Sequence, residues 1–479
     1  MDNIQLLIDN EDRAALSGGT YDRIDPVTGE VASRAAAGQP DDANVAAEAA
    51  ANAFAQWSAT GPGERGKLLL KAADIMDSKT GEFMRLMTTE TGATAPWGGF
   101  NTMFAANILR EAAAMTTQIS GEVIPSDKPG TLAMGARQAA GVCVGIAPWN
   151  APVILGTRAI AMPLACGNTV ILKASEMCPS THRLIGQVLR EAGFPKGVVN
   201  VVTNAPADAA KVVEALVAHP DVKRINFTGS SRVGKIIAKL AAEHLKPVLL
   251  ELGGKAPFVV LDDADLDAAV NAAAFGAYMN QGQICMSTER IIVDGKVADA
   301  FVEKLAAKAK ALPAGDPRGH VVLGALVTPE AAERVQEMVD DALAKGAVLM
   351  AGGGSIMEAT LVDHVTPAMR IYSEESFGPA KSVIRVNGDE EAIRVANDTE
   401  YGLSSAVFSR NVERAMAVAR RIESGICHIN GPTVGDEAQM PFGGVKASGY
   451  GRFGGRAAIA EFTDLRWITE EDAHQHYPF

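Results

Sequence analysis

Apolar and polar residues follow two distinct rhythms along the middle of the chain. From Gly141 onward, short runs that are apolar throughout are followed by longer stretches whose apolar residues recur at helical spacing. Strands that are apolar throughout are buried on both faces, which indicates a parallel sheet covered by helices. The pattern therefore predicts a doubly wound α/β unit with its ligand beyond the carboxyl ends of the strands. The predicted strands lie within residues 141–150, 169–176, 197–203, 222–229 and 247–255. The predicted helices cover residues 151–167, 179–193, 207–220 and 230–244.

The alternation continues more loosely after Gly254. Residues 256–286 predict a strand and a long Ala-rich helix that runs into a glycine loop, and later strands follow at 289–295 and 347–354. We therefore expect a second α/β domain. The first 120 residues are expected to be mostly Ala-rich helix, and residues 121–141 resemble an extended hairpin.

Composition narrows the class of protein. A chain of 479 residues is too long for one hydrophobic core, so two or three domains are expected. A net charge of −13 with no Lys/Arg run disfavours nucleic acid and acidic membranes as partners. The five cysteines have no paired spacing, which fits a reducing compartment. With no signal peptide and no apolar stretch of membrane-spanning length, a cytoplasmic protein is expected. His474 and His476 lack a third ligand nearby, so no metal site is expected.

The stretch "NFTGSSRVGKI" at 226–236 is one residue short of the phosphate loop of nucleotide hydrolases. Such a loop needs a hydroxyl for Mg²⁺ after its lysine, and Ile236 has none. The stretch nevertheless forms a strand-to-helix turn, where free N–H groups and the helix dipole attract an anion. Ser230 or Ser231 can cap this helix or donate to a phosphate. Either a plain capped turn or the pyrophosphate of a dinucleotide fits.

A dinucleotide fingerprint, "GYGRFG", occurs at 449–454. It does not follow a predicted strand and opens no βαβ unit, so we interpret it as a glycine-rich loop.

Three residues have side chains suited to nucleophilic chemistry. Cys285, in "NQGQICMST", is either a nucleophile that needs activation or a small buried hydrophobe. Glu251, in "VLLELGGK", ends a buried strand, where burial would raise its pKa toward that of a useful base. Alternatively, it caps the glycine turn. Asn150, in "APWNAPV", either caps the following helix or donates its amide to an oxyanion.

Lys173 and Glu176, in "VILKASE", follow the carboxyl end of another predicted strand. An acidic side chain at this place suits ribose hydroxyls and repels a 2′-phosphate.

Seven motifs together resemble the NAD(P)-dependent aldehyde dehydrogenase superfamily. They occur in that family's order between about Gly141 and Arg452, and the spacing of 34 residues between Glu251 and Cys285 also fits. The motifs are "PWN", "LKASE", "FTGS", "LELGGK", "NQGQIC", "EESFGP" and "PFGGVKASGYGR". One departure is Asn204, where many members have glycine.

The resemblance implies a mechanism. The Cys285 thiolate attacks the aldehyde and forms a thiohemiacetal, while Asn150 and the Cys285 backbone N–H hold the oxyanion. Hydride passes to NAD, with NADP as the less favoured cofactor, and Glu251 activates the water that hydrolyses the thioester. The cofactor residues implied are Ile146, Trp149, Lys173, Glu176, Gly229, Ser230, Gly234, Leu252, Glu375 and Phe377.

The resemblance also implies three domains and a homodimer or homotetramer. The NAD-binding domain comprises residues 1–119 and 141–253, and the catalytic domain comprises residues 254–447. A small β oligomerisation extension is formed by the hairpin at 120–140 and the tail at 448–479.

The substrate is expected to be an aromatic aldehyde. Arg158 lies eight residues after Asn150, on nearly the same helix face, where it can meet a phenolate, a carboxylate or a ring. A salt bridge at a domain or subunit surface is the alternative. Trp97 and Phe100 are expected to help wall the substrate tunnel, and the remaining substrate residues implied are Ile154, Ile284 and Phe442. The run from "PWN" to "LKASE" is similar to the branch that oxidises benzaldehyde-type compounds, including salicylaldehyde and vanillin dehydrogenases.

Three alternatives stay open. The same chemistry can act on an aliphatic aldehyde or a semialdehyde. The second alternative is a non-catalytic NAD-binding oligomer, although such a protein would have no need to keep Cys285, Glu251 and Asn150. A hydrolase that never uses NAD would cleave esters without forming NADH.

Overall fold

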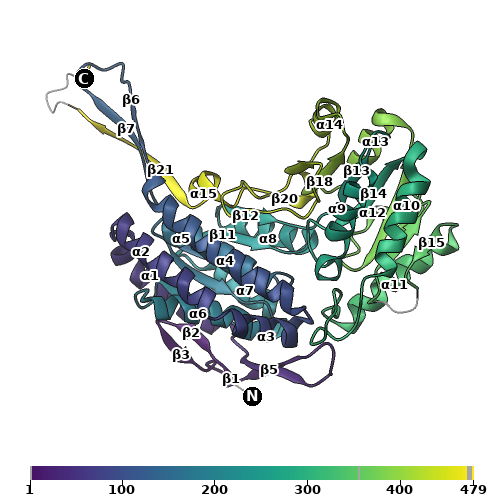
Figure 1. Cartoon of the computed structure of the whole chain (residues 1–479). Coiled ribbons are helices and arrows are strands. Elements are labelled where there is room, and N and C mark those ends of the chain that lie inside the picture. The colour runs from purple at the N-terminus through teal and green to yellow at the C-terminus, as the bar shows by residue number, and fades with distance from the viewer. Residues whose placement is uncertain (1–2, 354–356, 472–476) are drawn as a thin grey trace.

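Two large sheets, each covered by helices on both faces, make up most of the computed structural model (Figure 1). The structure describes residues 3–353, 357–471 and 477–479. The tail histidines His474 and His476 lie outside the described residues. The α/β fold class expected from the pattern is confirmed.

The first sheet has eight strands, and its five central strands run parallel. Its strands, in spatial order, are β20 (Gly449–Tyr450), β12 (Val248–Glu251), β11 (Val222–Thr228), β8 (Val142–Ile146), β9 (Thr169–Lys173), β10 (Val199–Val202), β2 (Leu6–Ile8) and β3 (Glu11–Arg13). The five parallel strands are the five that the apolar runs predict. The antiparallel edge strands β20, β2 and β3 come from distant parts of the chain.

Helices cover both faces of this sheet and build two separate cores. One face carries α1 (Pro40–Ser58), α7 (Ala209–Ala218) and α8 (Ser231–Glu243). The other carries α5 (Pro152–Ala165) and α6 (Pro179–Ala192), backed by α2 (Pro62–Ser78), α3 (Thr80–Thr91) and α4 (Ala95–Met115). Because strands and helices alternate along the chain, the turns that leave the carboxyl ends of β8, β9, β11 and β12 share one edge.

The second sheet has seven strands and a helical layer on each face. Its strands, in spatial order, are β15 (Val348–Ala351), β16 (Thr360–Asp363), β17 (Ala380–Val386), β14 (Thr288–Asp294), β13 (Ala256–Val260), β18 (Ser404–Phe408) and β19 (Ile426–Ile429). Its helices are α9 (Leu266–Tyr278), α10 (Gly295–Lys310), α11 (Pro329–Ala344), α12 (Arg370–Ser373), α13 (Gly388–Asn397) and α14 (Val412–Ala419).

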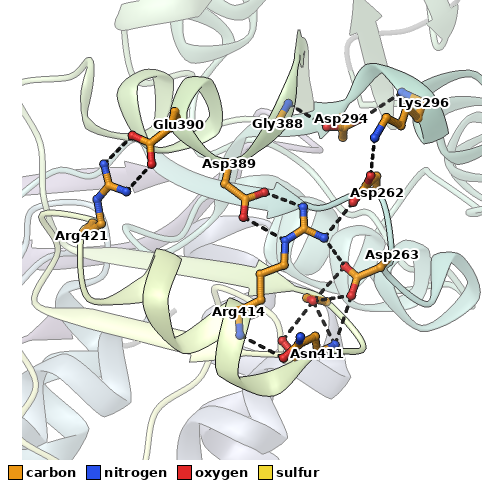
Figure 2. Close-up of polar contacts among 11 residues, drawn as sticks. Asp262, Asp263, Asp294, Lys296, Gly388, Asp389, Glu390, Asn411, Arg414 and Arg421 are labelled. Carbon is orange, nitrogen blue, oxygen red and sulfur yellow. Dashed lines mark hydrogen bonds and ion pairs between the residues drawn. The ribbon is translucent and has the colours of Figure 1, made fainter.

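Charged side chains join the loops at one end of the second sheet. Arg414 on α14 donates to Asp262, Asp263 and Asp389, so one guanidinium links the loop after β13 to the start of α13 (Figure 2). Asp294 caps α10 and also accepts from the backbone N–H of Gly388.

Two small sheets complete the fold. β21 (Thr463–Glu470), β7 (Leu132–Ala139) and β6 (Glu122–Ile124) form an antiparallel arm that projects from the body (Figure 1). The helix α15 (Gly455–Glu461) leads into this arm. The arm unites the hairpin and the tail assigned to the extension, whereas β20, which also lies in that tail, pairs with β12 in the eight-stranded sheet.

The expectation that the first 120 residues are mostly helix is wrong at its start. Strands β1 (Asn3–Ile4), β4 (Thr20–Ile24) and β5 (Val31–Ala36) form the second small sheet, and β2 and β3 join the eight-stranded one. β4 and β5 are rich in Ala, Ser, Asp and Arg, which have low strand propensity. Their strand structure comes from pairing with each other and with β1, which a local pattern does not reveal.

Candidate active site

Cys285 lies in a tight turn between α9 and β14. The backbone takes left-handed conformations at Asn280, Gln281 and Gly282, with φ of 48°, 56° and 73°. The Gln281 amide donates to the carbonyl of Ala325 at 2.9 Å, which ties this unusual turn to a neighbouring loop. The turn ends a long buried helix abruptly and leaves the cysteine at the boundary between the two large sheets.

Glu251 is the last residue of β12, and its side chain is buried. Neither carboxylate oxygen has a hydrogen-bond partner among the described residues. The alternative that Glu251 caps the glycine turn is therefore not supported. Burial raises the pKa of Glu251 to about 7, so the carboxyl can exchange a proton near neutral pH.

The Cys285 thiol lies next to this carboxyl group. Removal from water and the neighbouring Glu251 both raise the pKa of Cys285 well above its ordinary value, while Arg158 acts in the opposite direction. The thiol is therefore protonated at neutral pH, and it must lose this proton before it can act as a nucleophile.

Asn150 closes the turn between β8 and α5. Its side-chain Nδ2 donates to the carbonyl of Gln283 at 3.1 Å, two residues before the cysteine. Its own carbonyl accepts from Trp97 Nε1 and from Asn280 Nδ2, each at 3.0 Å. The side chain does not cap α5, whose N-cap residue is Ala151. These bonds hold the Asn150 amide against the cysteine turn.

An apolar cavity of about 200 Å³ opens on one side of Cys285. All five residues predicted to bind substrate line it, together with side chains that the sequence did not single out. The predicted residues are Trp97, Ile154, Arg158, Ile284 and Phe442; the others include Phe104, Phe275, Val434 and Asp436. Cavities of about 150 Å³ can hold benzene, so this one has room for one substituted ring.

Five aromatic side chains contribute to the cavity wall. Trp97 stacks on Phe100 at 5.5 Å between ring centroids, and Phe100 stacks on Phe104 at 5.8 Å. Arg158 lies with its guanidinium carbon 4.5 Å from the centroid of the Phe442 ring. Arg158 on α5 pairs with Asp436 in the loop after β19, so this salt bridge joins the two expected domains and also lines the cavity.

A second cavity opens on the other side of Cys285, and Cys285, Asn150 and Glu251 border it. Of the residues predicted to bind the cofactor, Trp149, Gly229, Ser230, Leu252, Glu375 and Phe377 line this cleft. Arg334, which the sequence did not single out, also lines it and donates to the carbonyls of Glu375 and Ser376. Of the three predicted catalytic residues, Cys285 and Asn150 thus border both cavities, and Glu251 borders the second.

Glu375 lines the cleft from the side of the seven-stranded sheet. Its carboxylate accepts from the backbone N–H of Gly254 at 2.9 Å, and burial raises its pKa to about 7. Phe377 takes a left-handed φ of 44° and contacts the Trp149 ring edge-on.

Helix α8 begins at this cleft. Ser230 caps it by accepting from the N–H of Val233 at 3.4 Å, while Ser231 donates to the carbonyl of Ala447. The first N–H groups of a helix have no partner within it, and the dipole adds positive potential there. Gly234 does not line the cleft; a methyl group there would lie 2.4 Å from Leu252, so this glycine allows close packing.

Ile146, Lys173 and Glu176 do not line the cleft, but they lie along the same sheet edge. Ile146 and Lys173 are aligned partners at the ends of β8 and β9. Lys173 pairs with Glu176, and the Asn204 amide donates to the Glu176 carboxylate at 3.0 Å. Although burial opposes ionisation, Lys173 and Asn204 hold the pKa of Glu176 below its usual value.

The loop at 449–454 and Ile236 both lie outside these cavities. Ile236 is on the exposed side of α8. Gly449 packs against β12, where a methyl group would lie 2.1 Å from the carbonyl oxygen of Leu250, which explains the glycines without a nucleotide. Among the described residues, no cluster of three His, Cys, Asp or Glu side chains is arranged for a metal. None of the helices in the described part of the chain combines the length and apolar character of a membrane span.

The sequence did not identify Asp436 or Arg334 as site residues, because neither belongs to a motif with a known spacing. Asp436 lies in the loop after β19, and its approach to Arg158 spans 278 residues of sequence. The acidic pair Asp436 and Glu437 in the otherwise uncharged loop "PTVGDEAQ" was the available signal.

Comparison with known proteins agrees with this geometry. The model of the aldehyde dehydrogenase family matches residues 14–468. The chain is 62% identical to vanillin dehydrogenase from Pseudomonas fluorescens over 99% of both sequences. It is 53% identical to salicylaldehyde dehydrogenase from Pseudomonas putida over 96% of both. The crystal structure of a salicylaldehyde dehydrogenase from Pseudomonas putida G7, complexed with salicylaldehyde, superimposes with a TM-score of 0.98 at 51% identity and full coverage of both chains. The chain belongs to the aldehyde dehydrogenase family, as its motifs predicted.

Proposed function

We propose that this protein oxidises an aromatic aldehyde to the carboxylic acid, with NAD as the hydride acceptor. The observation that carries the proposal is the position of Cys285, between an aromatic-lined cavity and the cleft at the N-terminus of α8. The chain's likeness to vanillin and salicylaldehyde dehydrogenases supports the aromatic substrate. The runner-up keeps this chemistry and changes the substrate to an aliphatic aldehyde or a semialdehyde.

In the first half-reaction, Cys285 is the nucleophile. Its thiol releases its proton to solvent, and Sγ bonds to the aldehyde carbon to give a thiohemiacetal. The Asn150 amide and the Cys285 backbone N–H stabilise the oxyanion that develops on the former carbonyl oxygen. Loss of hydride from the same carbon leaves a thioester on Cys285.

In the second half-reaction, Glu251 acts on water. With a pKa of about 7, the carboxylate can take a proton from a water molecule as that water attacks the thioester carbon. The carbon–sulfur bond breaks, the carboxylic acid leaves and the Cys285 sulfur takes up a proton. One aldehyde, one water and the hydride acceptor are consumed in each cycle.

The cleft residues suit a dinucleotide. Bound NAD would supply the hydride acceptor. The free N–H groups at the start of α8, with Gly229 and Ser230, would bind its pyrophosphate. Lys173 and Glu176 would bind the adenosine ribose, and Glu375 with Phe377 the nicotinamide side. An ionised Glu176 favours ribose hydroxyls over a 2′-phosphate, so NAD is proposed over NADP.

The projecting arm is the proposed oligomerisation element. Val123, Leu465 and Trp467 are 75%, 65% and 78% exposed on it. Exposed apolar side chains gathered on one protruding sheet are typical of a surface covered by another subunit. The proposed assembly is a homodimer or homotetramer. The five unpaired cysteines support a cytoplasmic location, because disulfides are rare in that reducing compartment.

The test is NADH formation at 340 nm with benzaldehyde, salicylaldehyde, vanillin, hexanal and succinic semialdehyde, each with NAD and with NADP. We expect kcat/KM to be highest for the aromatic aldehydes with NAD. Equal or better kcat/KM for hexanal or succinic semialdehyde would favour the runner-up. Binding of NAD without oxidation of any aldehyde would favour a non-catalytic oligomer.

A further inference from the structure

Asp436 introduces a carboxylate into an otherwise apolar cavity. It lines the cavity next to Val434 and Phe442, and its side chain is only 12% exposed. A buried carboxylate costs free energy unless it is paired and hydrogen-bonded. Its presence beside the aromatic walls therefore calls for a function.

The two oxygens of Asp436 have different surroundings. Oδ2 accepts a hydrogen bond from Nη2 of Arg158, whereas Oδ1 is buried and has no hydrogen-bond partner among the described residues. Burial raises the pKa of Asp436, and Arg158 opposes this by favouring the ionised form. An ionised carboxylate is only an acceptor, so Oδ1 requires a donor.

Three other polar side chains of the cavity wall are already engaged, whereas Nε2 of His428, whose pKa is lowered by burial and raised by the charge of Asp436, is buried without a hydrogen-bond partner among the described residues. Trp97 Nε1 donates to the carbonyl of Asn150, and Asn150 Nδ2 donates to the carbonyl of Gln283. Arg158 is held between Asp436 and the face of Phe442. Among the described side chains of the cavity wall, Asp436 Oδ1 is the buried acceptor without a partner.

Asp436 also lies close to the reacting groups. Its charge contributes to the raised pKa of Glu251, and that of its partner Arg158 affects the pKa of both Glu251 and Cys285. The cavity that Cys285 borders has room for one substituted ring, and Asp436 lies on the wall of the same cavity.

We propose that Asp436 determines substrate specificity by accepting, through Oδ1, a hydrogen bond from a hydroxyl group on the aromatic ring of the substrate. This inference rests on the proposed function. A hydroxybenzaldehyde supplies the missing donor, whereas benzaldehyde leaves Oδ1 unpaired. A methoxy group at the same ring position presents an oxygen that repels the carboxylate. Sites built to hydrogen-bond a substrate hydroxyl discriminate strongly against analogues that lack it.

The first experiment uses the wild-type enzyme and needs no variant. The value of kcat/KM is measured for benzaldehyde, for the 2-, 3- and 4-hydroxybenzaldehydes and for the matching methoxybenzaldehydes. At one ring position, the hydroxyl compound should exceed both its methoxy analogue and benzaldehyde by roughly 5- to 100-fold, as expected for pairing a buried acceptor. Oxidation of benzaldehyde without any hydroxyl preference overturns this inference and leaves the proposed function intact. Failure to oxidise any aromatic aldehyde overturns both.

The second experiment compares Asp436→Asn with Glu437→Gln, which makes the same chemical change at the exposed neighbouring residue. In Asp436→Asn the amide oxygen can still accept from Arg158, but the amide NH₂ group then occupies the place of Oδ1. The hydroxyl-to-benzaldehyde ratio of kcat/KM should fall roughly 5- to 100-fold, whatever the change on benzaldehyde itself. The kcat/KM for the methoxy compound should rise relative to that for benzaldehyde. Glu437→Gln should leave every ratio of kcat/KM unchanged. An equal loss on all substrates would indicate a purely structural residue. A rise in the hydroxyl ratio would indicate that a phenolate binds to Arg158 instead. Either result overturns the inference.

Discussion

The carbonyl oxygen of Cys285 lies so close to the backbone of Gly254 that a methyl group on that glycine would be 2.2 Å from it. This approach couples the loop after β12 to the turn that carries the thiol. Because Glu251 lies three residues before Gly254, the same contact holds the carboxyl group next to the sulfur. The backbone N–H of Gly254 also donates to the Glu375 carboxylate. Gly254 therefore links the turn that holds Cys285 to the wall of the second cavity.

Gly254→Ala should therefore remove activity with little loss of secondary structure. The added methyl must displace the cysteine turn, and small misplacements of reacting groups cost large factors in rate. We expect kcat/KM to fall by about 100-fold or more in the NADH assay, with an unchanged far-ultraviolet circular dichroism spectrum. Gly81→Ala is the control, because Gly81 lies in α3 with no atom within 4 Å of the added methyl. Wild-type activity in Gly254→Ala would show that the contact does not position Cys285.

Cys285→Ala should abolish aldehyde oxidation and leave NAD binding intact. The substitution removes the sulfur that forms the covalent intermediate but none of the groups at the start of α8. NADH formation measures the first effect, and quenching of tryptophan fluorescence on addition of NAD measures the second, since Trp149 lines the cleft. Cys427→Ala, at an exposed cysteine on β19, should retain full activity. Residual turnover in Cys285→Ala beyond that of a no-enzyme blank would rule out the thiohemiacetal route.

Glu251→Gln should leave a first burst of NADH and stop further turnover. The thioester still forms, but no base remains to activate water. Wild-type turnover should rise with pH through about 7, as Glu251 ionises, and the variant should lose that rise. Stopped-flow absorbance at 340 nm separates the burst from the steady state. If the burst disappears as well, Glu251 is needed earlier, as the base for the thiol.

The same substitution should affect stability in a pH-dependent way. The folded-state pKa of Glu251, about 7, lies above its ordinary value of 4.5. Between these values only the folded protein holds the proton, so the contribution of Glu251 to stability falls as pH rises through that window. Glu251→Gln should thus unfold at a temperature equal to or above that of the wild type at pH 8, and the advantage should vanish at pH 4.5.

Glu176→Gln should weaken the preference for NAD over NADP. Lys173 and Asn204 keep the carboxylate ionised, and its charge repels a 2′-phosphate. We expect the ratio of kcat/KM for NAD to that for NADP to fall by about tenfold, the equivalent of about 1.4 kcal/mol. Glu191→Gln, on α6 and paired with Lys79, is the matched control. An unchanged ratio would assign cofactor selection to other residues.

Arg414→Met should lower the stability of the second domain without changing the chemistry. Its removal leaves Asp262, Asp263 and Asp389 facing one another without a shared cation (Figure 2). Thermal unfolding should show a loss of about 1–3 kcal/mol at pH 7. Arg394→Met, which removes a single exposed pair with Glu391, should cost less than about 1 kcal/mol.

The cost of Arg414→Met should also depend on pH. Hydrogen bonds from Lys296 and Arg414 lower the pKa of Asp262 from 3.8 to about 2. The ion pair therefore contributes fully above pH 3.8 and is lost as pH falls toward 2. The difference in unfolding temperature between wild type and Arg414→Met should be smaller at pH 3 than at pH 7. A constant difference would mean that packing of the arginine stem dominates.

The sequence by itself determined the parallel core of the first sheet and the family of the chain. Strands such as β8 and β9 are continuous apolar runs, and burial on both faces is a local property that a sequence displays directly. Cys285, Glu251 and Asn150 stand in motifs whose spacing is distinctive, so they could be named before any coordinates.

Tertiary structure alone decided which distant residues meet. The first strands β1 to β5, the edge strand β20 and the loop that carries Asp436 have little local signal, because their partners lie far away in sequence. The difference has a physical reason: periodicity records whether a residue is buried, whereas the identity of its neighbours depends on how the whole chain closes. The unpaired oxygen of Asp436 beside the aromatic cavity belongs to this second class, and it is the feature on which we expect substrate choice to depend.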